Sequence, residues 1–373
     1  MTAASPPRES HDPEASGRTL FALALLAGAL LRLVLLGAPD LAGSDEGLWA
    51  VSARNVVEGG LGALFGVGRT PLGPPAPVPL LFPWLLQFMV RIFGAEEWAI
   101  RLPSVAAGLV GAFVLERIVR RGYGQPAGHL AGAFAALFPP LVAVSRAATV
   151  EAVLVTLGLF GVIFGLRALE EGGSADAALS GLSFGLGILA KGPAVLLFVA
   201  PLLVALAFRP RIVALGRTRR VLLIMAAAFA APTAIHLGSV FVFKPANLSV
   251  AVASVLGASL EGPSGTWGTE LKAIVRTLGL FLPLVGAGVA YLFRALGERE
   301  VESGATGVEA RLSHDAFWAT YMVELVVLVA VNGKFQLGTA PAMPVLAAFS
   351  GFGATALFLP NRESARRAES RFP

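Results

Sequence analysis

Long apolar runs, separated by short polar stretches, recur along the whole chain. The first run, residues 19–37, contains one charged residue, Arg32. Runs of about 16 to 24 residues are long enough, or nearly so, to cross the hydrocarbon core of a bilayer as helices. The pattern predicts an all-α polytopic membrane protein. The ten expected spans are 19–37, 103–119, 126–144, 150–168, 176–190, 192–208, 220–243, 273–293, 315–332 and 338–359.

Two further segments in the first long loop are predicted to be interfacial helices. The segment 79-PLLFPWLLQFMVRIFG-94 is short, contains Pro83, and carries Gln87 and Arg91, so it fits an interfacial or re-entrant helix better than a span. Residues 44–60 fit an amphipathic helix that ends at a glycine pair. Its expected apolar face is Leu48, Trp49, Val51 and Val56, and its expected polar face is Asp45, Glu46, Arg54 and Glu58.

The composition agrees with a membrane-embedded chain. Of 373 residues, 55% are hydrophobic and only 14% are charged, whereas a soluble domain has about 25% charged residues. The net charge of +5 is explained by arginines in short loops on one side of the membrane, so no nucleic-acid partner is expected. Cysteine is absent, which excludes disulfides and thiolate chemistry.

The placement of Lys and Arg predicts the topology through the positive-inside rule. If 79–94 does not span, 18 of the 29 Lys and Arg residues fall in cytoplasmic segments, and 10 fall in longer outer loops. If 79–94 did span, the five-arginine loop 209–220 would face outward. The rule therefore favours both termini in the cytoplasm and outer loops at 38–102 and 244–271. The expected location is the plasma (inner) membrane, with the site facing the periplasm or exterior.

We expect one membrane domain with two tails. The polar segment 1–18 is predicted to be a disordered cytoplasmic tail, and 361–373 a basic cytoplasmic tail. Residues 19–360 form the transmembrane catalytic domain, and the first apolar run is expected to be retained as a span.

Candidate chemistry gathers on the predicted outer side. Asp45 and Glu46 follow the first span, and either carboxylate fits a general base for a hydroxyl or amine. Lys191, Arg276 and Lys334 fit cations that stabilise a phosphate as it gains charge. Structural interpretations remain open: the acids also suit a helix N-terminus, and Lys191 also suits a lysine at a span end.

Five motifs, taken in order, resemble a known family. They are 45-DE-46, 84-WLLQFMVRIFGAEEWAIRLPSVAAG-108, 145-SRAATVEAVL-154, 185-GLGILAKGP-193 and 333-GKFQLGTAPAMPVLAAFSG-351. Together they resemble the polyprenyl/dolichyl-phosphate-dependent glycosyltransferases of the GT-C fold, in the bacterial branch of aminoarabinose transferases and protein O-mannosyltransferase relatives. The resemblance covers roughly residues 20 to 350.

The resemblance implies roles for residues of this chain. Asp45 becomes the expected base, with Glu46 beside it, in the first outer loop. Arg101 and Arg146 fall on the family's arginines in "RLPS" and "SR", and Lys191 falls on the lysine of "KGP". The full set of expected substrate- or phosphate-binding residues is Arg101, Arg146, Glu151, Lys191, Lys272, Arg276 and Lys334.

The chain departs from the family pattern at two places. Glu151 stands where the family has an aspartate, and 78-VPLLFPW-84 has no basic residue where the family has "KPPL" or "HPPL". Arg69 is the candidate substitute for that missing basic residue.

The expected activity is transfer of a sugar from a polyprenyl-phosphate-linked donor to an envelope glycan, lipid or protein acceptor, with inversion. A divalent metal ion near the acids is compatible with this chemistry but not required by it. Two alternatives stay open: a transporter or flippase of lipid-linked sugars, and a catalytically inactive relative that binds them.

Overall fold

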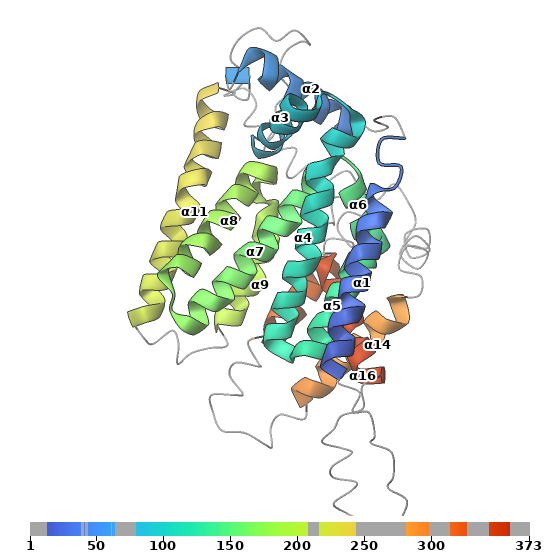
Figure 1. The fold of residues 1–373 in the computed structure, drawn as a ribbon. Helices are drawn as coiled ribbons and strands as arrows, with labels where there is room; N and C mark the ends of the chain where they lie inside the picture. The colour runs from blue at the N-terminus through green and yellow to red at the C-terminus, as the bar shows by residue number, and fades with distance from the viewer. Residues whose placement is uncertain are drawn as a thin grey trace, which may run out of the picture.

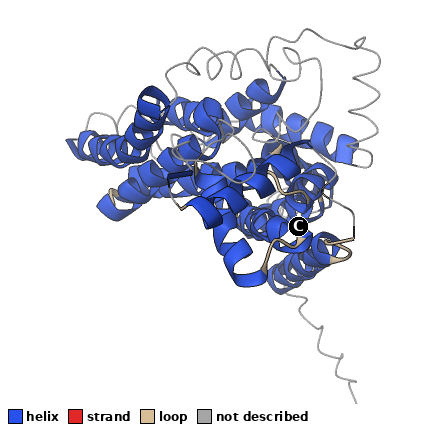
Figure 2. Ribbon diagram, turned by 90° about the horizontal axis from the view of Figure 1, so that it is seen from above, coloured by secondary structure: helices blue, strands red, loops and turns tan. Residues whose placement is uncertain are grey.

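The computed structural model describes residues 13–38, 41, 44–60, 62–63, 80–207, 216–243, 281–297, 314–326 and 343–358. The second outer loop, 244–271, and the candidates Lys272, Arg276 and Lys334 lie outside these residues. Regular structure in the described part is entirely helical (Figure 1, Figure 2).

The helices follow one another with short connections. In order they are α1 (Pro13–Leu33), α2 (Ser44–Gly59), α3 (Leu81–Phe93), α4 (Glu97–Tyr123), α5 (Gln125–Leu137), α6 (Pro139–Arg146), α7 (Val150–Glu171), α8 (Ser174–Lys191), the 3₁₀ turn η2 (Gly192–Val195), α9 (Leu196–Ala207), α11 (Gly216–Phe243), α14 (Phe281–Gly297) and α16 (Pro344–Phe358). Residues 314–326 form a further helix.

Four of the described helices are long and apolar enough to cross a membrane: α1, α4, α7 and α11. The bent pair of α5 and α6 counts as a fifth if it forms one broken span. The polytopic all-helical fold is therefore confirmed. The full number of ten spans stays a prediction, since several of the expected spans are short or lie partly outside the described residues.

The expected continuous span at 126–144 is broken in the structure. α5 and α6 meet at an angle of 51°, and Phe138 between them has extended backbone, with φ −64° and ψ 116°. The cause is the pair Pro139 and Pro140, because proline disfavours a helical residue before it and has no N–H for the helical ladder. The carbonyls of Ala135 and Ala136 consequently lose their helical donors.

The two helices predicted in the first outer loop are present. α2 ends at Gly59, and Gly60 follows with φ 73°. Figure 1 shows α2 and α3 at one end of the bundle, beside the start of α4 and the ends of α1 and α8. We call this end the α2 end. α1 begins at Pro13, inside the segment expected to be a tail, so the helix extends beyond the apolar run that defines the span.

α2 buries a face that only partly matches the expected one. Trp49 and Val56 are buried as predicted, but Val51 is 39% exposed. Ala53 takes its place on the buried face, and Glu46 is also buried rather than in polar surroundings. Trp49 packs edge-on against Phe82 of α3, with ring centroids 5.2 Å apart. This apolar layer, completed by Leu86, Ile100, Ala148, Val150, Val153 and Ala190, supports the α2 end.

Close helix packing in the bundle depends on glycine. On α8, Gly181 and Gly185 form a G-x-x-x-G pair that faces α11. A Cβ at Gly181 would lie 2.1 Å from the carbonyl oxygen of Met225. The two backbones therefore approach more closely than any larger residue allows, as is usual where helices pack in membranes.

Candidate active site at the α2 end

The described candidate residues gather at the α2 end of the bundle. Glu46 lies in the first turn of α2, Arg101 in the second turn of α4, and Arg146 at the end of α6. Glu151 lies in the first turn of α7 and Lys191 ends α8. Asp45 precedes Glu46 on α2, but its side chain lies outside the described part of the structure. Every candidate whose side chain the structure describes thus lies at the α2 end of the bundle.

Glu46 and Arg101 form a two-pronged ion pair. Arg101 Nε donates to Glu46 Oε1 and Nη2 donates to Oε2, both at 2.9 Å. Arg101 is only 4% exposed and Glu46 only 7%. Parallel hydrogen bonds between a guanidinium and a carboxylate fix orientation as well as distance, so this pair ties α2 firmly to α4.

Both partners of this ion pair make a further contact with backbone. The N–H of Ala148 donates to Glu46 Oε1 at 2.6 Å, and Arg101 Nη1 donates to the carbonyl of Leu36 at 2.7 Å. Each carboxylate oxygen of Glu46 therefore accepts at least one hydrogen bond. This arrangement suits a residue that holds the start of α2 in place better than one that takes a proton from an acceptor.

The second ion pair joins α7 and α8. Lys191 Nζ donates to Glu151 Oε1; the Glu151 side chain is 8% exposed and the Lys191 side chain 33%. An acid in the first turn of a helix and a base in the last turn both interact favourably with the helix dipole. Gly192, with φ 60°, then reverses the chain into η2. The Lys191 side chain thus stays one-third exposed at the α2 end.

Arg146 contacts the end of α1. Its guanidinium donates to the carbonyl of Leu31, and to that of Val34 at 3.0 Å. The last carbonyls of a helix lack intrahelical partners, so Arg146 caps α1. Arg146 has no carboxylate partner among the described residues.

Arg32 is a functional candidate that sequence reasoning did not select. It lies in the last turn of α1 and is fully buried, at 0% exposure. Its Nε donates to Ser145 Oγ at 2.7 Å, and Nη1 donates to the carbonyls of Gly28 and Ala136 at 3.0 and 2.6 Å. The available signal was an arginine inside an apolar run, which is costly in a membrane and therefore informative.

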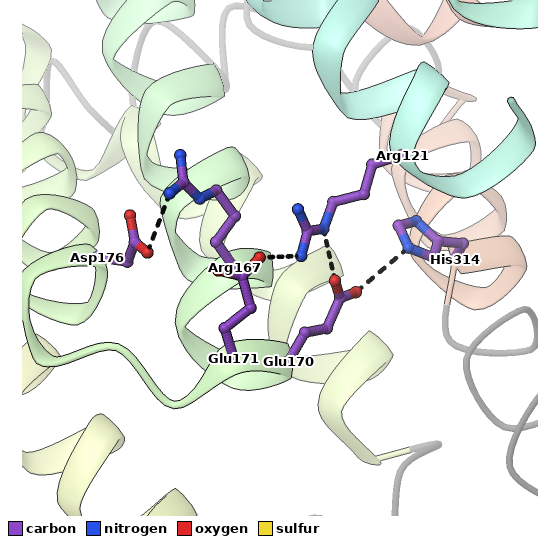
Figure 3. Close-up of polar contacts among 6 residues, drawn as sticks. All are labelled: Arg121, Arg167, Glu170, Glu171, Asp176 and His314. Atoms are coloured by element: carbon purple, nitrogen blue, oxygen red, sulfur yellow. Dashed lines mark hydrogen bonds and ion pairs between the residues drawn. The ribbon is translucent and has the colours of Figure 1, made fainter. Parts of the chain in front are cut away.

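A separate ionic network lies at the opposite end of the bundle (Figure 3). Arg121 of α4 donates to Glu170 and Glu171 at the end of α7, at 2.5 and 2.6 Å. His314 Nε2 lies 3.6 Å from Glu170, and Arg167 lies 3.5 Å from Asp176 of α8. These contacts connect helices around the opposite end and are remote from Glu46 and Lys191.

The charged residues described at the α2 end combine carboxylates and cations. Among the described residues, no group of three or more Asp, Glu or His is placed to hold a metal ion. The two buried carboxylates, Glu46 and Glu151, are each paired with a cation, while Arg32 and Arg146 bring further positive charge. Arg146 and Lys191 are the candidates at this end to meet an anionic ligand.

Comparison with known proteins agrees with the motifs. Residues 77–236 match the family described as dolichyl-phosphate-mannose-protein mannosyltransferase, PMT_2. The putative mannosyltransferase YycA of Bacillus subtilis is 35% identical over 89 residues, which are 24% of this chain and 13% of that protein.

Solved structures share the fold. The crystal structure of ArnT from Cupriavidus metallidurans bound to undecaprenyl phosphate matches with a TM-score of 0.70 and 20% identity, covering 96% of this chain and 63% of that chain. The apo oligosaccharyltransferase of Archaeoglobus fulgidus matches with a TM-score of 0.56 and 14% identity, covering 95% and 52%.

The chain spans less than two thirds of the length of each of these proteins. At such identities the structural likeness concerns the fold, while the family match concerns the sequence that carries Arg101, Arg146, Glu151 and Lys191. Over residues 77–236, therefore, the chain is similar in sequence to the PMT_2 family, and over most of its length it shares the GT-C-like fold of ArnT that its motifs predict.

Proposed function

We propose that this protein is an integral-membrane glycosyltransferase that moves a sugar from a polyprenyl-phosphate-linked donor to an acceptor hydroxyl or amine at the α2 end. The observation that carries the proposal is the convergence of Glu46, Arg101, Glu151 and Lys191 at this end, inside a family of lipid-phosphate-sugar transferases. The ArnT structure with undecaprenyl phosphate supports a prenyl carrier as the lipid.

In the proposed reaction Asp45 is the general base. Its carboxylate takes the proton from the acceptor, and the acceptor oxygen or nitrogen forms a bond to the anomeric carbon. The bond between that carbon and the phosphate oxygen breaks, and its electron pair leaves with the polyprenyl phosphate. Attack from the face opposite the phosphate inverts the anomeric centre. The proton ends on Asp45 and the added negative charge on the phosphate.

Glu46 holds Asp45 in place in this scheme. Because the two residues are adjacent in the first turn of α2, fixing the Glu46 carboxylate on Arg101 and Ala148 restricts the backbone on which Asp45 stands. The sequence-based role of Glu46 as a second base is thus replaced by a positioning role.

Lys191 is the proposed cation for the leaving phosphate. Its side chain is 33% exposed at the α2 end and is held by Glu151 from one side, which leaves its other donors for a ligand. Arg146 is a second candidate, and Lys272, Arg276 and Lys334 remain proposed contributors from outside the described residues.

The proposal includes a topology with ten spans, a cytoplasmic N-terminus and the α2 end outside the plasma membrane. The arginine distribution supports it. Because the chain has no cysteine, single cysteines placed at Ala95 and Ala175, which are exposed at opposite ends of the bundle, test it. An impermeant thiol reagent added to whole cells should label the first and not the second, and the reverse result would invert the topology.

One observation favours a second candidate, a lipid-sugar-binding relative without transfer activity: the stretch 78-VPLLFPW-84 lacks the family's basic residue. The deciding experiment uses purified protein in nanodiscs, with undecaprenyl-phosphate mannose as donor probe. Thermal stabilisation by undecaprenyl phosphate, but not by undecaprenol, is expected, together with slow hydrolysis of the donor, in which water takes the mannosyl group and undecaprenyl phosphate is released. Asp45→Asn should keep the stabilisation and lose the release. If the unaltered protein is stabilised but releases no undecaprenyl phosphate, the result supports the non-catalytic relative. If it shows neither stabilisation nor release, the result contradicts both functions.

A further inference from the structure

Arg32 is a buried cation whose charge no described carboxylate balances. Its Nη2 atom is buried and has no hydrogen-bond partner in the part of the chain that the structure describes. A buried charge is expensive to keep inside a membrane protein, and such residues usually serve a site. The contacts of its guanidinium indicate which parts of the chain it holds together.

The first set of Arg32 contacts is at the proline break between α5 and α6. Pro140 has no N–H, so the carbonyl of Ala136 lacks its donor within the helix. Arg32 Nη1 supplies that donor at 2.6 Å. The Arg32 side chain therefore binds the bundle at the point where the expected single span is broken.

The second set of contacts joins the end of α1 to Ser145 and Arg146 at the end of α6. Ser145 Oγ accepts from Arg32 Nε, and the next residue, Arg146, donates to the carbonyls of Leu31 and Val34. α1 thus offers a side chain to Ser145 and two carbonyls to Arg146. The end of α6 is held against the end of α1 from both sides.

These contacts form part of a closed ring. From Ser145 the chain runs to Ala148, whose N–H binds Glu46. Glu46 is bound by Arg101, and Arg101 binds the carbonyl of Leu36, just beyond α1. The ring therefore starts in the last turn of α1 and closes just beyond that helix, and it passes through Glu46 in the first turn of α2, next to Asp45.

We propose that Arg32 is a positioning residue: through Ser145 and the α6 end, it sets the placement of Glu46 and hence of the first turn of α2. The proposal deepens the proposed function, since it assigns a residue that supports the same site from inside the span. Arg32 does not touch the reacting atoms. Its effect reaches them through the ring.

A distance measurement tests the ring without any substrate. Because the chain has no cysteine, spin labels can be placed at Val51 of α2 and Ala143 of α6, both of which are exposed. The labelled protein gives the distribution of distances between α2 and α6. Arg32→Met keeps an apolar stem of similar length and removes the guanidinium. Ser145→Ala removes the acceptor of Arg32 Nε, together with the hydroxyl's own hydrogen bond to the Leu141 carbonyl within α6.

Both variants should broaden the distance distribution. The matched control is Ser180→Ala, which deletes an equally buried serine hydroxyl that donates to the carbonyl of Gly161 at 2.7 Å, outside the ring. The control should leave the distribution unchanged. If Arg32→Met does not fold, Ser145→Ala carries the test alone, because it leaves the Arg32 charge and its carbonyl contacts in place. A distribution in Ser145→Ala equal to that of the control would overturn the proposal.

Turnover of undecaprenyl-phosphate mannose gives the second readout. Misplacement of a catalytic group by about 1 Å costs roughly 100-fold in rate, so kcat should fall at least tenfold in Arg32→Met, while KM for this donor changes less than twofold. The double variant with Ser145→Ala should be no slower than Arg32→Met alone. Two results would contradict a positioning role for Arg32. One is a fall in kcat in Ser180→Ala as large as that in Arg32→Met. The other is a double variant in which the effects of Arg32→Met and Ser145→Ala on kcat add up. If the distance distribution broadens in the variants but even the unaltered protein does not turn over the donor, the positioning role of Arg32 is supported and only the proposed activity is contradicted.

Discussion

Arg101 meets Glu46 through two parallel hydrogen bonds of 2.9 Å, across 55 residues of sequence. The pair joins the first turn of α2 to α4 in a nearly dry environment, since neither residue is more than 7% exposed. In this setting each partner depends on the other, because an unpaired buried charge is strongly unfavourable.

Replacing Arg101 with Met should therefore both destabilise the protein and stop sugar transfer. We expect a loss of about 3 to 5 kcal/mol in the free energy of unfolding, the usual result of removing one partner of a buried ion pair. Thermal unfolding in detergent measures this. Arg54→Met is the control, since Arg54 pairs with Glu58 on the exposed side of α2, and such pairs contribute about 0.5 kcal/mol or less. Similar losses in the two variants would show that the Glu46 pair has no special role.

Lys191→Met should weaken binding of the lipid phosphate while keeping the fold. Lys191 is the more exposed partner of its ion pair, with a side chain 33% exposed against 8% for Glu151, so its loss opens the Glu151 carboxylate to solvent. We expect the dissociation constant for undecaprenyl phosphate, measured by thermal stabilisation, to rise at least tenfold, or about 1.4 kcal/mol. Arg167→Met removes a cation of the opposite end, paired with Asp176, and should leave this constant unchanged. An unchanged constant in Lys191→Met would remove Lys191 from the phosphate site.

The gathering of the described candidates at one end of the bundle was predictable, but their partners were not. Span ends and arginine placement group Glu46, Arg101 and Lys191 correctly, because both depend on positions along the chain. Which cation meets which acid depends on how α2 and α4 pack in three dimensions. Periodicity therefore predicted that Glu46 lies on a polar face. In the structure Glu46 can be buried because its carboxylate pairs with Arg101.

Two features of the fold were readable in principle. The pair Pro139 and Pro140 inside an apolar run signals a break, since neither residue has an N–H for the helical ladder. Arg32 in the first span signals a buried polar contact. Their connection was not readable, because the carbonyl of Ala136 and the hydroxyl of Ser145 lie more than 100 residues further along the chain.

Packing of α8 on α11 predicts opposite effects for two glycine substitutions. Gly181→Ala places a Cβ 2.1 Å from the Met225 carbonyl oxygen, so one helix must shift, and we expect destabilisation of about 1 to 3 kcal/mol. Gly238→Ala, on α11, meets no atom of the described residues within 4 Å and should be neutral or stabilise the helix by up to about 1 kcal/mol. Thermal unfolding of the two variants compares them directly. Equal effects would mean that α8 and α11 do not approach as closely as described.

Loss of the ionic network at the opposite end should lower the stability of the protein without changing its catalytic activity. Arg121 binds both Glu170 and Glu171 there, so Arg121→Met should lower the stability, by about 1 kcal/mol for a partly exposed network. Because none of these residues contacts Glu46, Arg101 or Lys191 in the described part of the chain, kcat and the donor KM should keep the values of the unaltered protein once the variant is folded. The measurement is turnover of undecaprenyl-phosphate mannose at a temperature well below the unfolding midpoint of the variant. A fall in kcat there, without loss of folded protein, would show that the two ends of the bundle are coupled and that the active site is not confined to the α2 end.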